Sequence, residues 1–220
     1  MIIISYGNNE NIIQQQGQEA MLAMLSQCRK DRVLASAAPG VKEQALVSSW
    51  LLESSLRKQG IQEPFVYEKS QRGKPYLVSQ GGGEVHFSLS HTNEMSVAAV
   101  SNHLVGVDAE RLGRGRQTVV ERFFASGERK YLSLCTGDEW DVSFTLFWTV
   151  KEAIAKCLDV NLAKLCQEVD VSGCAKDILH EAVKMYTPEI GDVYVCSFQV
   201  DGHIISCASQ SEDDFSLKRC

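Results

Sequence analysis

Apolar and polar positions in the first half of the chain change period several times. Residues 1–6 form a short apolar run that predicts a strand. Two stretches with apolar side chains at helical spacing then follow, residues 19–34 and 41–58, separated by Pro39-Gly40. Four short apolar runs bounded by turn residues predict further strands at 65–67, 76–78, 85–89 and 95–100.

A similar order of elements follows in the second half of the chain. It predicts a strand at 104–110, a loop at 111–116, helices at 126–134 and 141–158, and a hairpin of strands at 193–200 and 203–208. The polar tail 211–220 predicts no regular structure. We therefore expect an α+β fold of two similar α/β halves, residues 1–102 and 103–220, although no sequence repeat relates them.

Composition places the chain among soluble globular proteins, because hydrophobic residues make up 44% and charged residues 23%. No apolar run approaches the roughly 18 residues of a membrane span, and the first residues lack the basic segment of a secretory signal. We therefore expect a cytoplasmic protein with no membrane partner and with reduced thiols at its eight cysteines. Because no Cys-x-x-Cys pair occurs, a zinc ribbon is not expected.

Charge is distributed unevenly along the chain. The net charge of −6 argues against nucleic acid as a partner. Residues 111–130, however, hold six Arg or Lys against two Glu, which gives this segment a local charge of +4. Such a basic segment is either an interaction surface for an acidic partner or an ordinary solvated face.

Two carboxylates lie two residues apart in the segment Gly106-Val107-Asp108-Ala109-Glu110. Alternate residues of a strand face the same side, so Asp108 and Glu110 would be presented together. Paired carboxylates with open positions suit Mg²⁺, and Mn²⁺ accepts the same oxygen ligands. The alternative for this segment is a solvated strand edge.

Two further segments carry candidate chemistry. In the helix 141–158, Glu152 and Lys156 are four residues apart and share a face, which fits either a site or a surface ion pair. The segment Phe87-Ser88-Leu89-Ser90-His91 and the turn Arg72-Gly73-Lys74-Pro75 combine a His and a Lys with backbone donors, an arrangement that can receive phosphate. Each of these segments is a weak signal by itself.

Four motifs, taken together, resemble the 4′-phosphopantetheinyl transferase superfamily, and within it the Sfp (surfactin-synthetase-activating) type. They are Gly73-Lys74-Pro75, Phe87 to His91, Gly106 to Glu110, and Trp148-Thr-Val-Lys-Glu-Ala-Ile-Ala-Lys156, in family order and with family-like spacing. The resemblance implies two α/β halves in a pseudo-twofold arrangement, with the active site and the coenzyme A site between them. Two halves in one chain also favour a monomer.

The resemblance implies an activity and a role for each matching residue. The activity is transfer of 4′-phosphopantetheine from coenzyme A to a serine of an apo acyl or peptidyl carrier protein, with release of 3′,5′-ADP. Asp108, Glu110 and Glu152 match the ligands of Mg²⁺ or Mn²⁺. Glu152 also matches the general base, and Lys156 a lysine that meets phosphate. Lys74, Ser90 and His91 match coenzyme A contacts, with Lys151 as a further candidate and Asp108 beside the pyrophosphate.

The chain departs from the family at one expected phosphate contact. The family usually has an arginine for the 3′-phosphate in the helix that matches residues 41–58. This chain has Glu53 and Ser54 near that place and no Arg before Arg57. Lys42, Arg29, Lys30 and Arg32 are the candidate substitutes. The carrier could serve fatty-acid, polyketide or nonribosomal-peptide synthesis.

Two other functions are left open by the sequence. One is a coenzyme A-binding protein without transfer activity, against which the intact acidic positions argue. The other is a different Mg²⁺-dependent phosphotransferase. The lack of a Gly-x-x-x-x-Gly-Lys-Ser/Thr loop argues against an ordinary nucleotide kinase.

Overall fold

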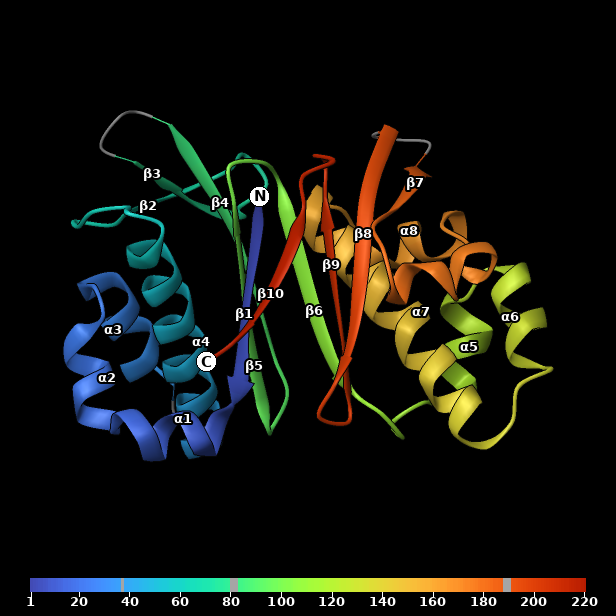
Figure 1. Ribbon diagram of the computed structural model, residues 1–220, viewed down its shortest axis with the longest axis horizontal. Coiled ribbons are helices and arrows are strands. Elements are labelled where there is room, and N and C mark those ends of the chain that lie inside the picture. The colour runs from blue at the N-terminus through green and yellow to red at the C-terminus, as the bar shows by residue number, and fades with distance from the viewer. Residues whose placement is uncertain (37, 80–82, 188–190) are drawn as a thin grey trace. The chain divides into compact units, whose positions relative to one another are not determined.

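The computed structural model describes residues 1–36, 38–79, 83–187 and 191–220, and it divides into two compact units (Figure 1). The first unit comprises Met1–His103 together with Phe215–Cys220, and the second comprises Leu104–Asp214. Each unit contains one sheet with helices packed on it, so the predicted α+β class is confirmed. No helix in the described ranges is long and apolar enough to cross a membrane.

A six-stranded sheet with the order β10-β1-β5-β4-β3-β2 forms the first unit. Its strands are β1 (Ile2–Asn8), β2 (Val66–Lys69), β3 (Pro75–Val78), β4 (Glu84–His91), β5 (Met95–Ser101) and β10 (Phe215–Arg219). The helices on it are α1 (Asn9–Gln16), α2 (Gln18–Met24), α3 (Gln27–Leu34) and α4 (Pro39–Lys58). The apolar periodicity of α4 is explained by its burial, because Leu51, Leu52 and Leu56 are fully buried in the core of this unit.

The C-terminal strand differs from the sequence-based expectation. The tail was predicted to lack regular structure, but β10 pairs in parallel with β1 from Ile2↔Phe215 to Tyr6↔Arg219. Strand β1 is almost wholly buried, and without β10 one edge of it would leave its backbone groups unpaired. The last six residues therefore belong to the first unit, not to a half that spans 103–220.

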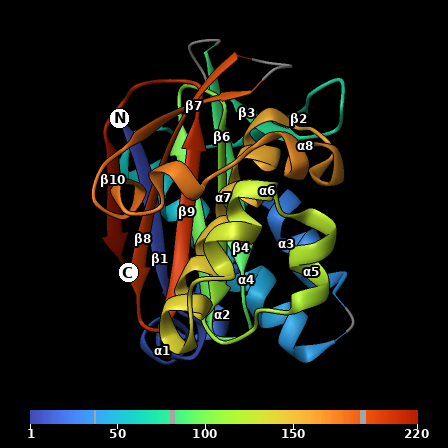
Figure 2. The same cartoon turned by 90° about the vertical axis from the view of Figure 1, so that its right-hand side faces the viewer.

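A four-stranded antiparallel sheet with the order β6-β9-β8-β7 forms the second unit. Its strands are β6 (Val105–Arg111), β7 (Val183–Thr187), β8 (Gly191–Val200) and β9 (His203–Ser209). Its helices are α5 (Gln117–Phe123), α6 (Ser126–Leu132), α7 (Gly137–Leu158) and α8 (Leu162–Glu168), with 3₁₀ turns η1 (Ser172–Cys174) and η2 (Asp177–Leu179). Figure 2 shows these helices in front of their sheet. The predicted hairpin is confirmed, since Asp201 and Gly202 both take positive φ between β8 and β9.

Helix α7 packs on β6 at unusually close range because Gly106 has no side chain. A Cβ on Gly106 would lie 2.0 Å from the carbonyl oxygen of Ala153 and 2.3 Å from the amide nitrogen of Cys157. Both atoms belong to the backbone of α7, so the helix itself would have to move. The glycine of the Gly-Val-Asp-Ala-Glu motif therefore sets the distance between the strand and the helix.

Replacing Gly106 by Ala is expected to destabilise the second unit and to displace α7. Added volume in a packed core typically costs about 1–3 kcal/mol, and the upper end is expected here because the obstacle is backbone. Urea unfolding monitored by circular dichroism measures the loss. Gly173→Ala is the matched control, because a Cβ there meets no atom within 4 Å. Equal stability of the two variants would contradict the role given to Gly106.

Candidate active site

Strand β6 presents two carboxylates on the side that faces α7. Gly106 contacts α7, and alternate residues of a strand share a face, so Asp108 and Glu110 point to the same side. Asp108 is only 4% exposed, whereas Glu110 is half-buried. The predicted pairing of these two side chains on one strand face is therefore present.

Helix α7 brings Glu152 to the same two carboxylates. Burial is the largest cause of the raised pKa of Glu152, and the negative charge of Asp108 is the next. The pKa of Glu110 is raised mainly by burial, then by Asp108, with a smaller contribution from Glu152. Asp108 thus influences both glutamates, and charge interactions of this kind weaken with distance and with solvent screening. Residues 42 positions apart in sequence, Glu110 and Glu152, thus share one acidic cluster.

Lys156 supplies a positive charge to this acidic cluster. Its Nζ donates to Oδ1 of Asp108 at 2.6 Å and to the carbonyl oxygen of Val107 at 3.3 Å. Its charge also counteracts the rise in the pKa of Glu152. With its side chain 33% exposed, the ammonium lies at the edge of the cluster and is open to solvent. It can therefore meet an anion that approaches the carboxylates.

The cluster has the donor chemistry of a divalent-cation site. Among the described residues, no group of three or more His, Cys, Asp or Glu side chains is placed so that it could hold a metal ion. Asp108, Glu110 and Glu152 nevertheless offer only oxygen ligands, as Mg²⁺ prefers. Burial, and then the negative charge of Asp108, raise the pKa values of Glu110 and Glu152, and a nearby cation would favour their ionised forms. The donor types of these residues therefore suit such an ion, but their side chains are not arranged around one.

A Glu110→Gln substitution tests this crowding of charge. A carboxyl group with a raised folded-state pKa contributes stability below its unfolded pKa and loses that contribution as the pH rises through the folded pKa. Ionisation of Glu110 is therefore less favourable in the folded metal-free protein than in the unfolded chain. We expect Glu110→Gln to raise the melting temperature in EDTA, and to raise it more at pH 8 than at pH 5. Glu121→Gln, an exposed site on α5, is the control, and a gain that is independent of pH would contradict the assignment.

Lys151 lies elsewhere, and its candidate role as a coenzyme A contact is wrong. The side chain is fully buried, with Nζ 3.0 Å from Oε2 of Glu128. Nζ also donates to the carbonyl oxygens of Cys166, at 2.5 Å, and of Val169. Glu128 accepts from the amides of Ala125 and Val171, so both charges are satisfied inside the unit. An ammonium enclosed in this way cannot reach a ligand.

The three coenzyme A candidates of the first unit occupy different parts of its sheet. Lys74 immediately precedes β3, and its charge contributes to the lowered pKa of His86, of which burial is the main cause. Continuing the β3–β4 register from Tyr76↔His86 sets Lys74 level with Ser88. Ser90 is buried. His91 is exposed at the end of β4, and its backbone lies about 10 Å along the strand from Ser88. A single phosphate could not contact the backbones of Lys74 and His91 together. The long side chain of Lys74 and a diphosphate could span that distance.

The first unit also contains a basic cavity that the sequence motifs did not reveal. The cavity has a volume of about 400 Å³ and is lined by Cys28, Arg29, Arg32, Tyr67, Glu68, Lys69, Gly73 and Pro75. Arg29, Arg32 and Lys69 are cations. In sequence, Lys74 lies between two other lining residues, Gly73 and Pro75. Because the lining residues come from α3, β2 and the turn before β3, no local pattern could have identified them.

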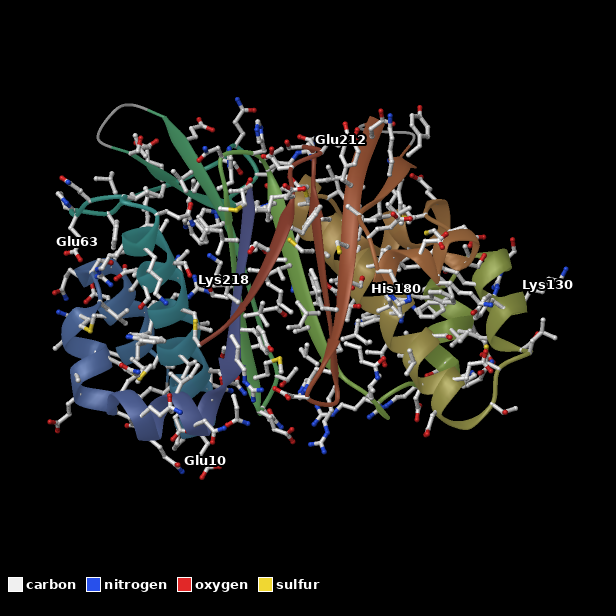
Figure 3. The ribbon with its side chains drawn as sticks, viewed as in Figure 1. Glu10, Glu63, Lys130, His180, Glu212 and Lys218 are labelled. Carbon is white, nitrogen blue, oxygen red and sulfur yellow. The ribbon has the colours of Figure 1, made fainter. Side chains whose placement is uncertain are left out.

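A second cavity lies beside the acidic cluster in the second unit. It has a volume of about 280 Å³ and is lined by Glu110, Arg111, Arg114, Arg116, Val119, Phe144, Thr145 and Trp148. Three arginines of the basic segment 111–130 therefore lie next to a carboxylate of the cluster and beside apolar side chains. Lys130, from the other end of that segment, instead projects from α6 into solvent (Figure 3).

Comparison with known proteins identifies similar sequences. Residues 104–208 match the family model of the 4′-phosphopantetheinyl transferase superfamily. The chain is 30% identical over 141 residues, 61% of its length, to the 4′-phosphopantetheinyl transferase gsp of Aneurinibacillus migulanus, of which the match covers 58%. It is 32% identical to the 4′-phosphopantetheinyl transferase psf-1 of Bacillus pumilus, over 43% of this chain and 40% of that protein. A 4′-phosphopantetheinyl transferase of Bacillus subtilis is 31% identical over 38% of this chain and 37% of its own length. The matches thus span about two fifths to three fifths of these relatives.

Proposed function

Residues 104–208 belong to the 4′-phosphopantetheinyl transferase superfamily, and we propose that the chain transfers 4′-phosphopantetheine from coenzyme A to a serine of an apo acyl or peptidyl carrier protein. The observation that carries the proposal is the acidic cluster of Asp108, Glu110 and Glu152, which lies inside the matched segment. In the reaction, the serine oxygen bonds to the β-phosphorus of coenzyme A. The bond from that phosphorus to the bridging oxygen breaks, and 3′,5′-ADP leaves.

Asp108, Glu110 and Glu152 would hold Mg²⁺, or Mn²⁺, together with the pyrophosphate. When bound, such an ion neutralises phosphate charge and stabilises the leaving group. The ammonium of Lys156, at the edge of the cluster, would bind a phosphate oxygen and add positive charge where the leaving group gains negative charge. Positioning and charge neutralisation of this kind are the main requirements of phosphoryl transfer.

Glu152 would accept the proton of the attacking serine hydroxyl on its carboxylate. A raised pKa makes a carboxylate a stronger base. Helix α7, packed without a gap on Gly106, holds that carboxylate at a fixed distance from β6. Asp108 accepts a hydrogen bond from Lys156 and orients its ammonium.

Residues of the first unit would bind the phosphates of coenzyme A. Lys74, Ser90 and His91 are proposed to contact its phosphates. The basic cavity of the first unit supports a substitute for the missing arginine of α4, because Arg29 and Arg32 line it beside the Gly73-Lys74-Pro75 turn. Of the four candidate substitutes, these two are proposed to bind the 3′-phosphate. We place the protein in the cytoplasm as a monomer.

The cavity beside Glu110 is proposed to receive the carrier protein. Its arginines would attract an acidic helix next to the modified serine, and Val119, Phe144 and Trp148 would contact apolar side chains of that helix. Charge steering of this kind acts mainly on the association rate and weakens with salt, because the Debye length falls from about 10 Å at 0.1 M to about 3 Å at 1 M.

Reversing two of these charges, Arg114→Glu with Arg116→Glu, is expected to raise the KM for a whole carrier about tenfold or more. The KM for coenzyme A should change little. A short serine peptide without the acidic helix should be affected less than the carrier. Steady-state kinetics with both acceptors make the comparison, and Arg129→Glu on α6 is the matched control. Equal losses on both acceptors would mean that the arginines form only a solvated surface.

Intact-mass measurement tests the proposed function directly. An apo carrier protein is incubated with coenzyme A, Mg²⁺ and the full chain, and its mass is expected to rise by one phosphopantetheine. Binding of coenzyme A without this mass gain, across fatty-acid, polyketide and nonribosomal-peptide carriers, would instead favour a binding protein. The absence of both binding and transfer would overturn the assignment to coenzyme A.

A further inference from the structure

Helix α4 carries a fully buried carboxylate, Glu53, in the helix where the family resemblance implies a phosphate-binding arginine. Its oxygens accept hydrogen bonds from the amide of Ser26 at 2.8 Å, the hydroxyl of Ser26 at 2.5 Å and the hydroxyl of Tyr67 at 2.9 Å. Nη2 of Arg57, one turn along α4, lies 3.5 Å from Oε2 of Glu53. A buried carboxylate is costly unless it is paired in this way, so its surroundings are specific for an anion.

The hydrogen bonds of Glu53 fix the start of α3. Ser26 is the N-cap of α3, and its own side chain makes no capping bond within that helix. The carboxylate of Glu53 instead accepts the free amide at this end, where negative charge also complements the helix dipole. Helix α3 carries Arg29 and Arg32, both of which line the basic cavity. Glu53 therefore holds the element that supplies two of the cations.

The hydrogen bond from Tyr67 connects Glu53 to Arg29 by a second route. The guanidinium carbon of Arg29 lies 4.6 Å from the centre of the Tyr67 ring and 4.9 Å from that of Phe87. Burial, and the charge of Glu53, raise the pKa of Tyr67, so the hydroxyl stays protonated and donates to Glu53. This hydrogen bond fixes the position of the Tyr67 ring, over which the guanidinium of Arg29 lies.

Arg29 has unused capacity for an anion. The side chain is 4% exposed, and within the described ranges its Nε has no hydrogen-bond acceptor. Arg29 is one of the residues that line the basic cavity, and a cationic N–H group without an acceptor is a natural donor to a phosphate oxygen. Glu53 itself is fully enclosed and fully hydrogen-bonded, so its charge stabilises the arginine without meeting the ligand.

We propose that Glu53 is a positioning residue, which fixes α3 and Tyr67 so that Arg29 presents its guanidinium to the 3′-phosphate of the nucleotide. The proposal rests on the proposed function for the identity of the ligand. The acidic residue of α4 thus acts through the arginine of α3, and together they replace the cation expected in α4. The selectivity that follows is for a nucleotide with a 3′-phosphate over one without it.

Calorimetric titration with adenosine 3′,5′-bisphosphate and with AMP measures that selectivity without any need for transfer. The full chain should bind the bisphosphate more tightly than AMP. Glu53→Gln cannot accept all of the same hydrogen bonds, because its amide nitrogen is a donor. We expect it to weaken bisphosphate binding about tenfold, or about 1.4 kcal/mol, and to leave AMP binding unchanged. Glu43→Gln, exposed on the same helix, is the matched control and should change neither.

A double-mutant cycle tests whether Glu53 acts through Arg29. In an Arg29→Met background, Glu53→Gln should cause no further loss of selectivity, whereas independent effects would add. If Glu53→Gln does not fold, Tyr67→Phe takes its place, since it removes one hydrogen bond and keeps the ring. Equal losses for both nucleotides, no loss for either, or additive losses would overturn the proposal. Retained selectivity with no transfer to any carrier would overturn the proposed function alone.

Discussion

A Glu152→Gln variant is expected to keep the fold and to lose at least a hundredfold in the rate of phosphopantetheine transfer. General-base catalysis typically contributes about 10²–10⁴ in rate, and the amide can neither accept the serine proton nor ligate a cation as strongly. The fold should survive because the substitution removes a carboxylate whose raised pKa reports an unfavourable environment for charge. Single-turnover transfer at saturating coenzyme A and Mg²⁺ measures the loss of the chemical step.

Asp108→Ala is the second variant of this experiment, and it should lose transfer as well because it removes both a proposed ligand and the partner of Lys156. Glu139→Gln is the matched control, because it is an exposed carboxylate on the same helix. A near wild-type rate in Glu152→Gln or Asp108→Ala at saturating Mg²⁺ would remove the acidic cluster from the reaction. Circular dichroism of each variant separates a lost site from a lost fold.

Local periodicity was sufficient for elements that bury one face against their immediate surroundings. The helix predicted at 141–158 is the main part of α7, and the hairpin around Asp201-Gly202 is present. Strand β10 was missed because its sequence is polar and its formation depends on β1, at the other end of the chain. Pairing between strands so distant in sequence leaves no local signal, since only the partner makes the strand favourable.

Part of the site could also be predicted from local patterns in the sequence. The two carboxylates of β6 follow from strand alternation. The resemblance to the family was drawn from four ordered motifs, and the family model matches residues 104–208, which contain the last two of them. The basic cavity was not predictable, because Arg29, Lys69 and Gly73 come from three separate elements. Glu53 could be read only as a departure from the family, since its partners Ser26 and Tyr67 lie far from it in sequence.

Lys151 illustrates a limit of transferring a role through a motif. It is adjacent to Glu152 in sequence, but neighbouring residues on a helix differ in direction by about 100°. The side chain of Lys151 therefore points to a different part of the unit, where Glu128 of α6 receives it. Nothing in the segment 147–156 identifies Glu128, because the contact depends on how α6 packs on α7.

Replacing Lys151 by Met should accordingly reduce the free energy of unfolding by about 3–5 kcal/mol, the usual cost of leaving one member of a buried ion pair alone. The charge of Lys151 lowers the pKa of Glu128, whereas burial raises it. Without Lys151 that pKa should rise further, so the deficit should be largest at neutral pH and should shrink as the pH falls below about 4, where the carboxyl group becomes protonated in the unfolded state as well as in the folded state. Urea unfolding at several pH values measures this dependence.

Two further variants decide between a structural and a ligand-binding lysine. Lys164→Met, exposed on α8, should leave stability nearly unchanged. Glu128→Gln added to Lys151→Met should recover part of the loss, because the uncompensated charge is removed while an amide oxygen can still accept from the backbone of Ala125 or Val171. If Lys151→Met instead reduced the free energy of unfolding by less than about 1 kcal/mol and raised the KM for coenzyme A, Lys151 would be a coenzyme A contact, as the motif implies. A fully buried ammonium held by one carboxylate and two carbonyl oxygens predicts the opposite, a large loss of stability in every condition that keeps Glu128 ionised.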